Sequence, residues 1–311
     1  MKIAVTGATG FVGRELLTRL QHAGHDVVPI VRRRTGVSNE IIAGGLECAD
    51  VPALAVELNG VDAIAHLAAL THVREHLENA RQAFQLVNVQ GTQRLLDAAS
   101  AAGVRRFVYM SSIKVNGEET HLDHRFSSHD TPAPEDDYGR TKYAAELLIA
   151  AEAHAAGMET VILRPPMVYG SGVGGNFGRL VLAVQRGIPL PFESVSNLRS
   201  LISVRNLADA TICALTSAEA DGMVLPVSDG EDVSTPALVE AIGVAVGRRA
   251  RLIPVPVTAL KLAGRLFGRG EEVRRIVGNL RIDNEAARMA LGWSPQDHLQ
   301  PALVRMLHPA K

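Results

Sequence analysis

Residues 1–13 read MKIAVTGATGFVG, and the fold of this chain follows from them. Residues 2–6 are typical of a short buried strand, and residues 14–23 of a helix. Between them Gly7, Gly10 and Gly13 recur at a spacing of three. Glycines let a backbone approach phosphates closely, and the N-terminus of a helix attracts negative charge. The stretch therefore predicts a dinucleotide-binding turn. The alternative is a tight strand–helix turn without a ligand.

The composition narrows the class of protein. The chain has 311 residues, of which 47% are hydrophobic and 21% charged, as in an ordinary globular protein. A net charge of −1 and 4% aromatic residues disfavour nucleic acid as a partner. The two cysteines are far apart, which indicates neither disulfides nor a metal site and favours a cytoplasmic location. The chain starts on a strand and has no run of 18 apolar residues, so we expect no signal peptide and no membrane span.

The end of the second predicted strand, over residues 26–31, bears on the choice of nucleotide. Arg32, Arg33 and Arg34 follow it directly. An acidic side chain here would bind the 2′-hydroxyl of the adenosine ribose, whereas an arginine pairs with a 2′-phosphate. The sequence therefore favours NADP over NAD. The alternative is that the three arginines form a solvated basic turn that contacts no nucleotide.

Further strands are predicted over residues 44–48, 61–67, 106–110, 160–164 and 223–227. Helices alternate with them, including a long one over residues 78–102 that contains Asn88. This alternation predicts an α/β fold with a doubly wound parallel sheet. Asp50 could bind the adenine amino group or cap the helix that Pro52 begins. Ala68 and Ala69 are small enough to let the backbone pass close to a cofactor.

The composition changes after residue 170. We expect a dinucleotide-binding domain over residues 1–170, with 200–230 returning to it. A smaller, mainly helical substrate-binding lobe would comprise 171–199 and 231–311. An amphipathic helix is expected near residues 260–267, with basic residues beside its apolar face. Packing of that face inside the lobe is expected rather than contact with a membrane surface.

Three side chains form a chemical constellation. Tyr138 and Lys142 are four residues apart, which places them on one face of a helix. A nearby ammonium group should lower the pKa of the tyrosine, which could then exchange a proton with a substrate oxygen. Ser111 and Ser112 end a predicted strand, where a hydroxyl could bind the same oxygen.

These motifs together resemble the extended short-chain dehydrogenase/reductases, in the NAD-dependent epimerase/dehydratase family. The resembling segments span the chain: 6–13, 111–117, 138–142, 164–170 and 291–295. The resemblance implies a Rossmann fold with Ser112, Tyr138 and Lys142 as the catalytic residues. Asn116 departs from the pattern, since a tyrosine is usual there. The cofactor contacts implied are those of Gly7, Gly10, Phe11, Val12, Gly13, Arg32, Asp50, Val51, Leu67, Ala68, Ala69, Asn88, Tyr138, Lys142, Pro165 and Val168.

Residues 174–177 and 197–201 further resemble enzymes that act at C4 of UDP-linked sugars in polysaccharide synthesis. This resemblance implies that Asn176 and Arg199 hold the UDP diphosphate. The reaction would be a UDP-sugar 4-epimerisation or an NADPH-dependent reduction of a UDP-4-keto sugar. A dehydratase is disfavoured, because Ile113 and Lys114 stand where those enzymes usually have Asp-Glu.

Two further expectations complete the interpretation. Relatives pair through helices near residues 78–102 and 139–156, which implies a homodimer. The alternative to an enzyme is a regulatory protein that senses NADP(H) without turning over a substrate. Because such relatives often lose the tyrosine or the lysine, the presence of Tyr138 and Lys142 favours an enzyme.

Overall fold

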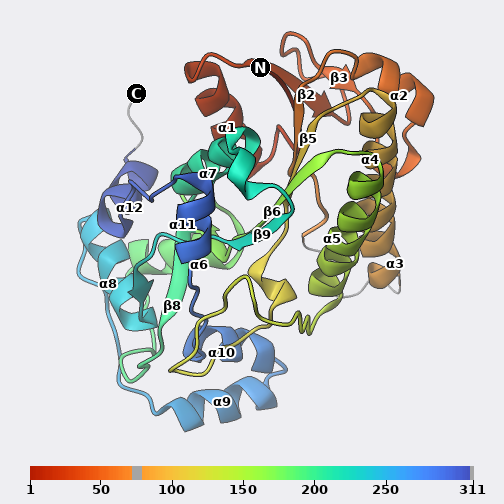
Figure 1. The fold of residues 1–311 in the computed structure, drawn as a ribbon. Coiled ribbons are helices and arrows are strands. Elements are labelled where there is room, and N and C mark those ends of the chain that lie inside the picture. The colour runs from red at the N-terminus through yellow and green to blue at the C-terminus, as the bar shows by residue number, and fades with distance from the viewer. Residues whose placement is uncertain (72–78, 309–311) are drawn as a thin grey trace.

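A seven-stranded parallel sheet organises the computed structural model, which describes residues 1–71 and 79–308 (Figure 1). The strand order is β3-β2-β1-β4-β5-β6-β9, and every pairing is parallel. This order reverses between β1 and β4, which is where open sheets of this kind bind ligands. The strands are β1 (Lys2–Thr6), β2 (Asp26–Val31), β3 (Ile41–Ile42), β4 (Ala63–His66), β5 (Arg106–Met110), β6 (Glu159–Arg164) and β9 (Met223–Pro226).

Helices cover both faces of this sheet, so its central strands are buried and read as apolar runs. One core packs α1 (Phe11–His22) and α7 (Val204–Thr216) against one face. The second core packs α2 (Val51–Glu57), α4 (Gly91–Ala101) and α5 (Asp137–Ala155) against the other. The predicted doubly wound α/β fold is confirmed.

A smaller sheet and several helices form the remainder of the molecule (Figure 1). The sheet has the order β10-β8-β7, and a third core packs α6, α8 and α12 against it. The elements are β7 (Met167–Tyr169), α6 (Gly175–Gln185), β8 (Arg199–Ser203), β10 (Asp232–Val233), α8 (Thr235–Val246), α9 (Val257–Leu266), α10 (Gly270–Val277), α11 (Glu285–Leu291) and α12 (Leu299–Leu307). Across the described residues we find no helix with both the length and the apolar character to cross a membrane.

Two predicted elements were wrong in detail. Residues 44–48 form no strand: Gly44 has a φ of 67°, which ends the extended chain, and Leu46–Cys48 is a 3₁₀ turn. The helix predicted over 78–102 is divided into α3 (Ala80–Phe84), a π-helical turn (Gln85–Gln90) and α4. Its first residue, Glu78, lies outside the described residues. The π-helical turn matters for function because it presents Asn88.

The expected boundary of the smaller lobe also needs a correction. Helix α11 was expected within that lobe, but Ala287, Leu291 and Trp293 are buried in the first core of the large sheet. Its neighbours in the fold are β9 and α7. The chain therefore returns to the large sheet once more before α12, because its apolar side chains complete the cover over β9.

A buried ion pair ties α5 to the sheet. Arg164 donates to both carboxylate oxygens of Glu146, at 2.5 and 3.0 Å, and both side chains are 4% exposed. Arg164 also donates to Asn116 Oδ1 at 2.9 Å, and the Ser111 hydroxyl donates to Glu146. Asn116, the residue that departs from the family pattern, thus has a structural role here.

Replacing Glu146 with Gln should lower the free energy of unfolding by about 3–5 kcal/mol, because the charge of Arg164 stays buried without its partner. Urea unfolding followed by circular dichroism measures this change. Glu57→Gln, an exposed carboxylate at the end of α2, is the matched control and should change little. A loss below about 1 kcal/mol, the usual value of an exposed pair, would contradict the structural role.

Candidate active site

One cavity of about 1680 Å³ lies beyond the carboxyl ends of β1 and β4. Its walls include residues 6–13 after β1, residues 67–69 after β4, and part of the smaller lobe around α6 and α10. Pockets for a single small molecule are usually about 300–1,000 Å³. The cavity is therefore large enough for a dinucleotide together with a second ligand.

The glycine turn fits the pyrophosphate of a dinucleotide. Gly7 has a φ of 68°, and a Cβ on it would lie 2.8 Å from the backbone nitrogen of Ala68. A Cβ on Gly13 would lie 2.1 Å from the carbonyl oxygen of Gly7. Helix α1 begins after Gly10 with neither a side-chain cap nor an acidic residue in its first turn. Its free N–H groups therefore face the cavity, as an anion site requires.

The adenosine end of the cavity contains the basic run. Arg32, Arg33 and Arg34 all line it, together with Leu46 and Glu47, which sequence reasoning missed. Nothing in the sequence pattern distinguished these last two, because they lie in the turn that was predicted as a strand.

Asp50 and Val51 do not line this cavity. Asp50 is the N-cap of α2, and its carboxylate accepts from the N–H of Ala53 at 3.2 Å. The structure thus supports the second of the two alternatives for Asp50, the cap of the helix that Pro52 begins.

Ser112 and Tyr138 both line the cavity, and the Ser112 hydroxyl is near enough to affect the pKa of Tyr138. Ser112 lies two residues after the end of β5, where it caps a short 3₁₀ turn. Tyr138 lies in the first turn of α5. Burial and then the Asp136 carboxylate raise the pKa of Tyr138 well above its usual value, while the Ser112 hydroxyl lowers it. The tyrosine is therefore a neutral phenol that can donate a proton to an oxygen bound here.

Lys142 does not lower the pKa of Tyr138 as expected. It is fully buried and does not line the cavity, and its Nζ donates to the hydroxyl of Tyr109 at 3.1 Å. The ammonium also lies 4.3 Å from the centre of the Tyr109 ring. Burial lowers the pKa of Lys142 to about 7, although the Glu146 carboxylate opposes this shift. Near neutral pH the lysine can therefore hold or release its proton.

A chain of buried polar groups continues from Lys142 toward the glycine turn. The Tyr109 ring lies beside His66, with ring centroids 5.5 Å apart, and His66 Nε2 contacts the hydroxyl of Thr92 at 2.9 Å. His66 Nδ1 contacts the hydroxyl of Thr6 at 2.7 Å. Thr6 already accepts from the N–H groups of residues 67 and 68, so it must donate to His66. His66 is then the neutral tautomer with its proton on Nε2.

Asn88 holds the cavity wall rather than lining the cavity. Its side chain accepts from the N–H of Leu70 at 2.7 Å and donates to the carbonyl of Leu70 at 3.1 Å. It also donates to Thr141 on α5 at 3.2 Å. This buried amide fixes the segment after β4 against the helix that bears Tyr138.

The residues expected to bind the substrate come from the smaller lobe. Asn176 and Arg199 line the same cavity as the glycine turn. Asn176 is not the N-cap of α6, because that position is Gly174. Arg199 donates to the carbonyl of Gly278 at 3.1 Å, and burial lowers its pKa to about 10. It thus remains a cation at neutral pH.

Phe11, Val12 and Val168 line the cavity as expected, but Pro165 does not. The next residue, Pro166, takes its place. The carbonyl of Pro165 instead accepts from the N–H of Ile113 at 2.9 Å, which directs this residue toward β5.

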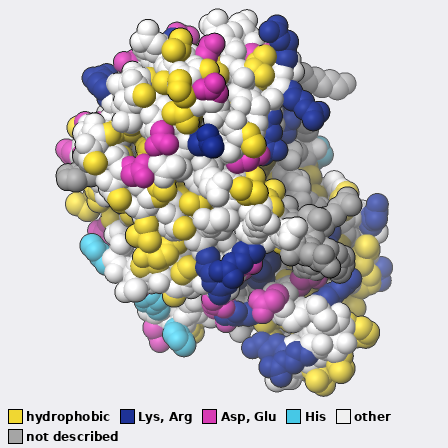
Figure 2. All heavy atoms as spheres, turned by 90° about the vertical axis from the view of Figure 1, so that its right-hand side faces the viewer, with side chains coloured by type: hydrophobic (Ala, Val, Ile, Leu, Met, Phe, Trp, Pro, Cys, Tyr) yellow, Lys and Arg dark blue, Asp and Glu magenta, His cyan; other side chains and the backbone are white. Residues whose placement is uncertain are grey.

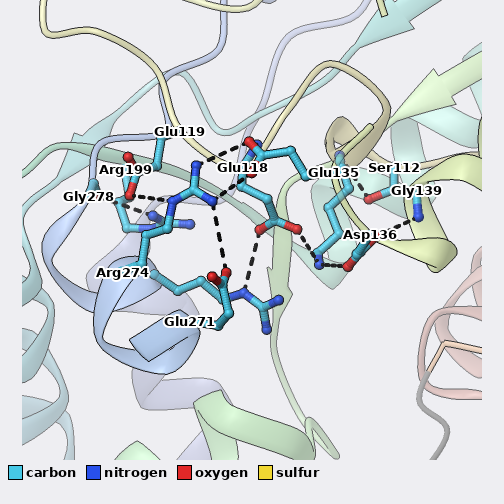
Figure 3. A network of polar contacts seen from close by, with 12 residues as sticks. Ser112, Glu118, Glu119, Glu135, Asp136, Gly139, Arg199, Glu271, Arg274 and Gly278 are labelled. Carbon is cyan, nitrogen blue, oxygen red and sulfur yellow. Dashed lines mark hydrogen bonds and ion pairs between the residues drawn. The ribbon is translucent and has the colours of Figure 1, made fainter. Parts of the chain in front are cut away.

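A network of charges that sequence reasoning missed forms another part of the wall (Figure 3). Lys114 Nζ contacts Glu118 at 2.6 Å and Asp136 at 2.5 Å. Asp136 accepts from the N–H of Gly139 at 2.7 Å and so caps the helix that carries Tyr138. An aspartate three residues before a glycine at a helix start was the available signal. Among the described residues no cluster of His, Cys, Asp or Glu could hold a metal ion.

Comparison with known proteins agrees with this geometry. The model of the NAD dependent epimerase/dehydratase family matches residues 3–225. The UDP-glucose 4-epimerase of Vibrio cholerae is 39% identical over 304 residues, which cover 96% of this chain and 92% of that protein. The structure of MoeE5 in complex with UDP-glucose and NAD is 29% identical with a TM-score of 0.79, and covers 99% of this chain and 98% of that chain. MoeE5 in complex with UDP-glucuronic acid and NAD is 28% identical with the same TM-score and the same coverage.

His66 should make the unfolding free energy sensitive to acid. Burial and Lys142 lower its pKa from 6.5 to about 3, so the unfolded chain binds one proton more than the folded chain between these values. Stability should therefore fall by about 1.4 kcal/mol for each pH unit as the pH drops through this window. The depressed pKa of Lys142, about 7, acts only above the window.

Urea unfolding at several pH values between 7 and 4 measures this slope. His66→Gln can keep both hydrogen bonds without titrating, and should flatten the slope even if it is less stable at pH 7. His121→Gln, in an exposed loop, should leave the slope unchanged. Equal slopes for wild type and His66→Gln would show that His66 is not held neutral.

Proposed function

Because this chain belongs to the NAD dependent epimerase/dehydratase family, we propose that it is an oxidoreductase that acts at C4 of a UDP-linked hexose. The reaction that its relatives support is 4-epimerisation, since the Vibrio cholerae relative is a UDP-glucose 4-epimerase. MoeE5, with the TM-score of 0.79, has been observed with UDP-sugars and NAD. The proposal extends these properties to the present chain.

The continuous cavity is the observation that carries this proposal. The glycine turn, the hydroxyls of Ser112 and Tyr138, and the polar groups of Asn176 and Arg199 all line it. A nicotinamide dinucleotide on the glycine turn and a sugar diphosphate near Arg199 would therefore share one space. A guanidinium and an amide are well suited to bind diphosphate oxygens.

The residues of the chain can then be given roles. Ser112 would donate to the C4 oxygen and align it with Tyr138. Tyr138 would take the proton of the C4 hydroxyl on oxidation and return it on reduction. A bound nicotinamide would accept and return the hydride, and its positive charge in the oxidised form would favour the phenolate. Lys142, with a pKa of about 7, would supply or withdraw a proton behind the tyrosine through a modest movement away from Tyr109.

Reduction of a UDP-4-keto sugar is the second candidate, and the arginines favour it. Arg32, Arg33 and Arg34 line the cavity with no acidic residue among them. Net reduction usually uses NADPH, whose 2′-phosphate an arginine can bind. A sensor of NADP(H) is not favoured, because Ser112 and Tyr138 are both present and both line the cavity.

Product analysis distinguishes the two reactions. The purified protein would be incubated with UDP-glucose, UDP-N-acetylglucosamine or a UDP-4-keto-6-deoxy sugar, with NADH or NADPH. C4 epimers formed without net use of cofactor would support the epimerase. Stoichiometric consumption of NADPH with the keto sugar alone would support the reductase. If no substrate turned over and no epimer formed, the sensor would replace both.

Tyr138→Phe should reduce kcat by about 10²- to 10⁴-fold, because it removes the group that transfers the proton. The same product assay measures the loss. Tyr143→Phe is the matched control, since Tyr143 lies on the same helix but does not line the cavity. Loss of activity in both variants, or in neither, would contradict the role of Tyr138.

Arg32→Ala should weaken binding of NADP more than binding of NAD, by about tenfold, because only NADP carries the 2′-phosphate that a guanidinium can pair with. Isothermal titration calorimetry with each of the two nucleotides measures the two dissociation constants. Arg288→Ala, on α11, is a control that lies outside the cavity wall. An equal effect on both nucleotides would show that the arginine does not read the 2′ position.

Two further proposals concern the oligomeric state and which part of the chain binds which ligand. We propose a homodimer that pairs through α4 and α5, where Leu147 is 54% exposed. We propose also that residues 171–199 and 231–311, apart from α11, serve the sugar nucleotide, while the large sheet serves the dinucleotide.

A further inference from the structure

Helix α9 (Val257–Leu266) lies at one end of the molecule and packs mainly against α10 (Figure 1). The contact is close at Gly264, where a Cβ would lie 2.7 Å from a methyl carbon of Val273. Gly264 is the buried residue of the helix. The remaining faces of α9 are therefore left open to solvent. This contradicts the expectation that its apolar face packs inside the lobe.

The open face of α9 carries large apolar side chains. Leu262 is 60% exposed, Leu266 75% and Phe267 78%. In a helix, residues two positions before and after Gly264 point to the side opposite to it. Leu262 and Leu266 thus stand away from the body of the protein. Clustered apolar side chains on a soluble surface usually mark an interaction site.

The chain from the end of α8 through α9 carries a concentrated positive charge. Residues 241–270 contain six basic residues and no acidic one, in a chain whose net charge is −1. Lys261, Arg265 and Arg269 flank the apolar face, and within the described structure none of these three forms an ion pair. The space-filling view shows basic and hydrophobic side chains gathered together on the protruding lower end (Figure 2). The six are Arg248, Arg249, Arg251, Lys261, Arg265 and Arg269.

We propose that this face of α9 docks on an anionic lipid surface. Leu262, Leu266 and Phe267 would enter the boundary between headgroups and acyl chains, while the basic side chains would lie among the negative headgroups. A second copy of the chain fits less well, because a twofold contact would bring the same positive patch against itself. The face is also a protruding ridge, which suits a planar surface.

Docking would place lipid one helix away from the candidate active site. Helix α10 contributes Glu272, Arg275 and Ile276 to the cavity wall. Its Arg274 pairs with Glu119 at 3.1 Å and with Glu135 at 2.6 Å, in the segment between β5 and α5 (Figure 3). The docking proposal stands independently of the proposed reaction.

Cosedimentation with vesicles tests the proposal on the full chain. Vesicles of phosphatidylcholine alone are compared with vesicles that also contain phosphatidylglycerol. Partitioning should be at least about tenfold stronger on the anionic vesicles and should weaken as salt is added. Equal partitioning on both kinds of vesicle, or none on either, would overturn the proposal.

Two sets of variants separate the two contributions. The triple variant Leu262→Ser, Leu266→Ser, Phe267→Ser and the triple variant Lys261→Gln, Arg265→Gln, Arg269→Gln should each lower partitioning at least about tenfold. The double variant Val56→Ser, Met289→Ser is the matched control, since these side chains are 76% and 73% exposed on α2 and α11. It should bind vesicles as the wild type does.

Circular dichroism and the turnover assay show whether the variants keep the fold. Triple variants that are folded yet still bind vesicles like the wild type would overturn the proposal. Analytical ultracentrifugation tests the competing occupant. Self-association that the apolar triple variant abolishes, without vesicle binding by the wild type, would show that α9 contacts a second copy instead.

Discussion

The hydroxyl of Thr6 joins the two turns between which the cavity opens. It accepts from the N–H groups of Leu67 and Ala68 at 3.1 and 3.0 Å, so the ends of β1 and β4 stay together. At the next position, a Cβ on Gly7 would lie 2.8 Å from the nitrogen of Ala68. The backbone of the turn after β1 and that of the turn after β4 are therefore each held in a single conformation by the other. Because this conformation leaves the first N–H groups of α1 uncovered, the anion site is present before any ligand binds.

From this contact a group of buried polar side chains extends through the sheet toward α5, the helix that carries Tyr138 and Lys142. His66 accepts a hydrogen bond from the Thr6 hydroxyl and contacts Thr92, and its ring lies 5.5 Å from that of Tyr109, the partner of Lys142. Buried polar groups of this kind are stable only when each has a partner. This group has that property, and it explains why the pKa values of His66 and Lys142 are both depressed: burial disfavours their charged forms.

Local patterns were sufficient for much of the fold and for two residues of the cavity wall, Ser112 and Tyr138. The apolar runs of β1, β2 and β5 and the glycine turn were predictable, since each signal lies within a few residues. Ser112 and Tyr138 were also named from their motifs. The turn at residues 44–48 was not predicted, because Gly44, with a φ of 67°, ended an apolar run that otherwise resembled a strand. The exposure of α9 was missed because an apolar helix face is usually a buried one.

The sequence by itself determined the α/β fold and the glycine turn after β1, and it singled out the hydroxyl groups of Ser112 and Tyr138, because periodicity and motif spacing are local properties of the chain. Tertiary structure alone decided which partner each polar group takes. Lys142 bonds Tyr109, 33 residues earlier in the chain, and Arg164 pairs with Glu146 and Asn116. It also decided that the open face of α9 has no cover from the chain. Burial and pairing depend on segments that meet only after folding, and no local pattern contains them.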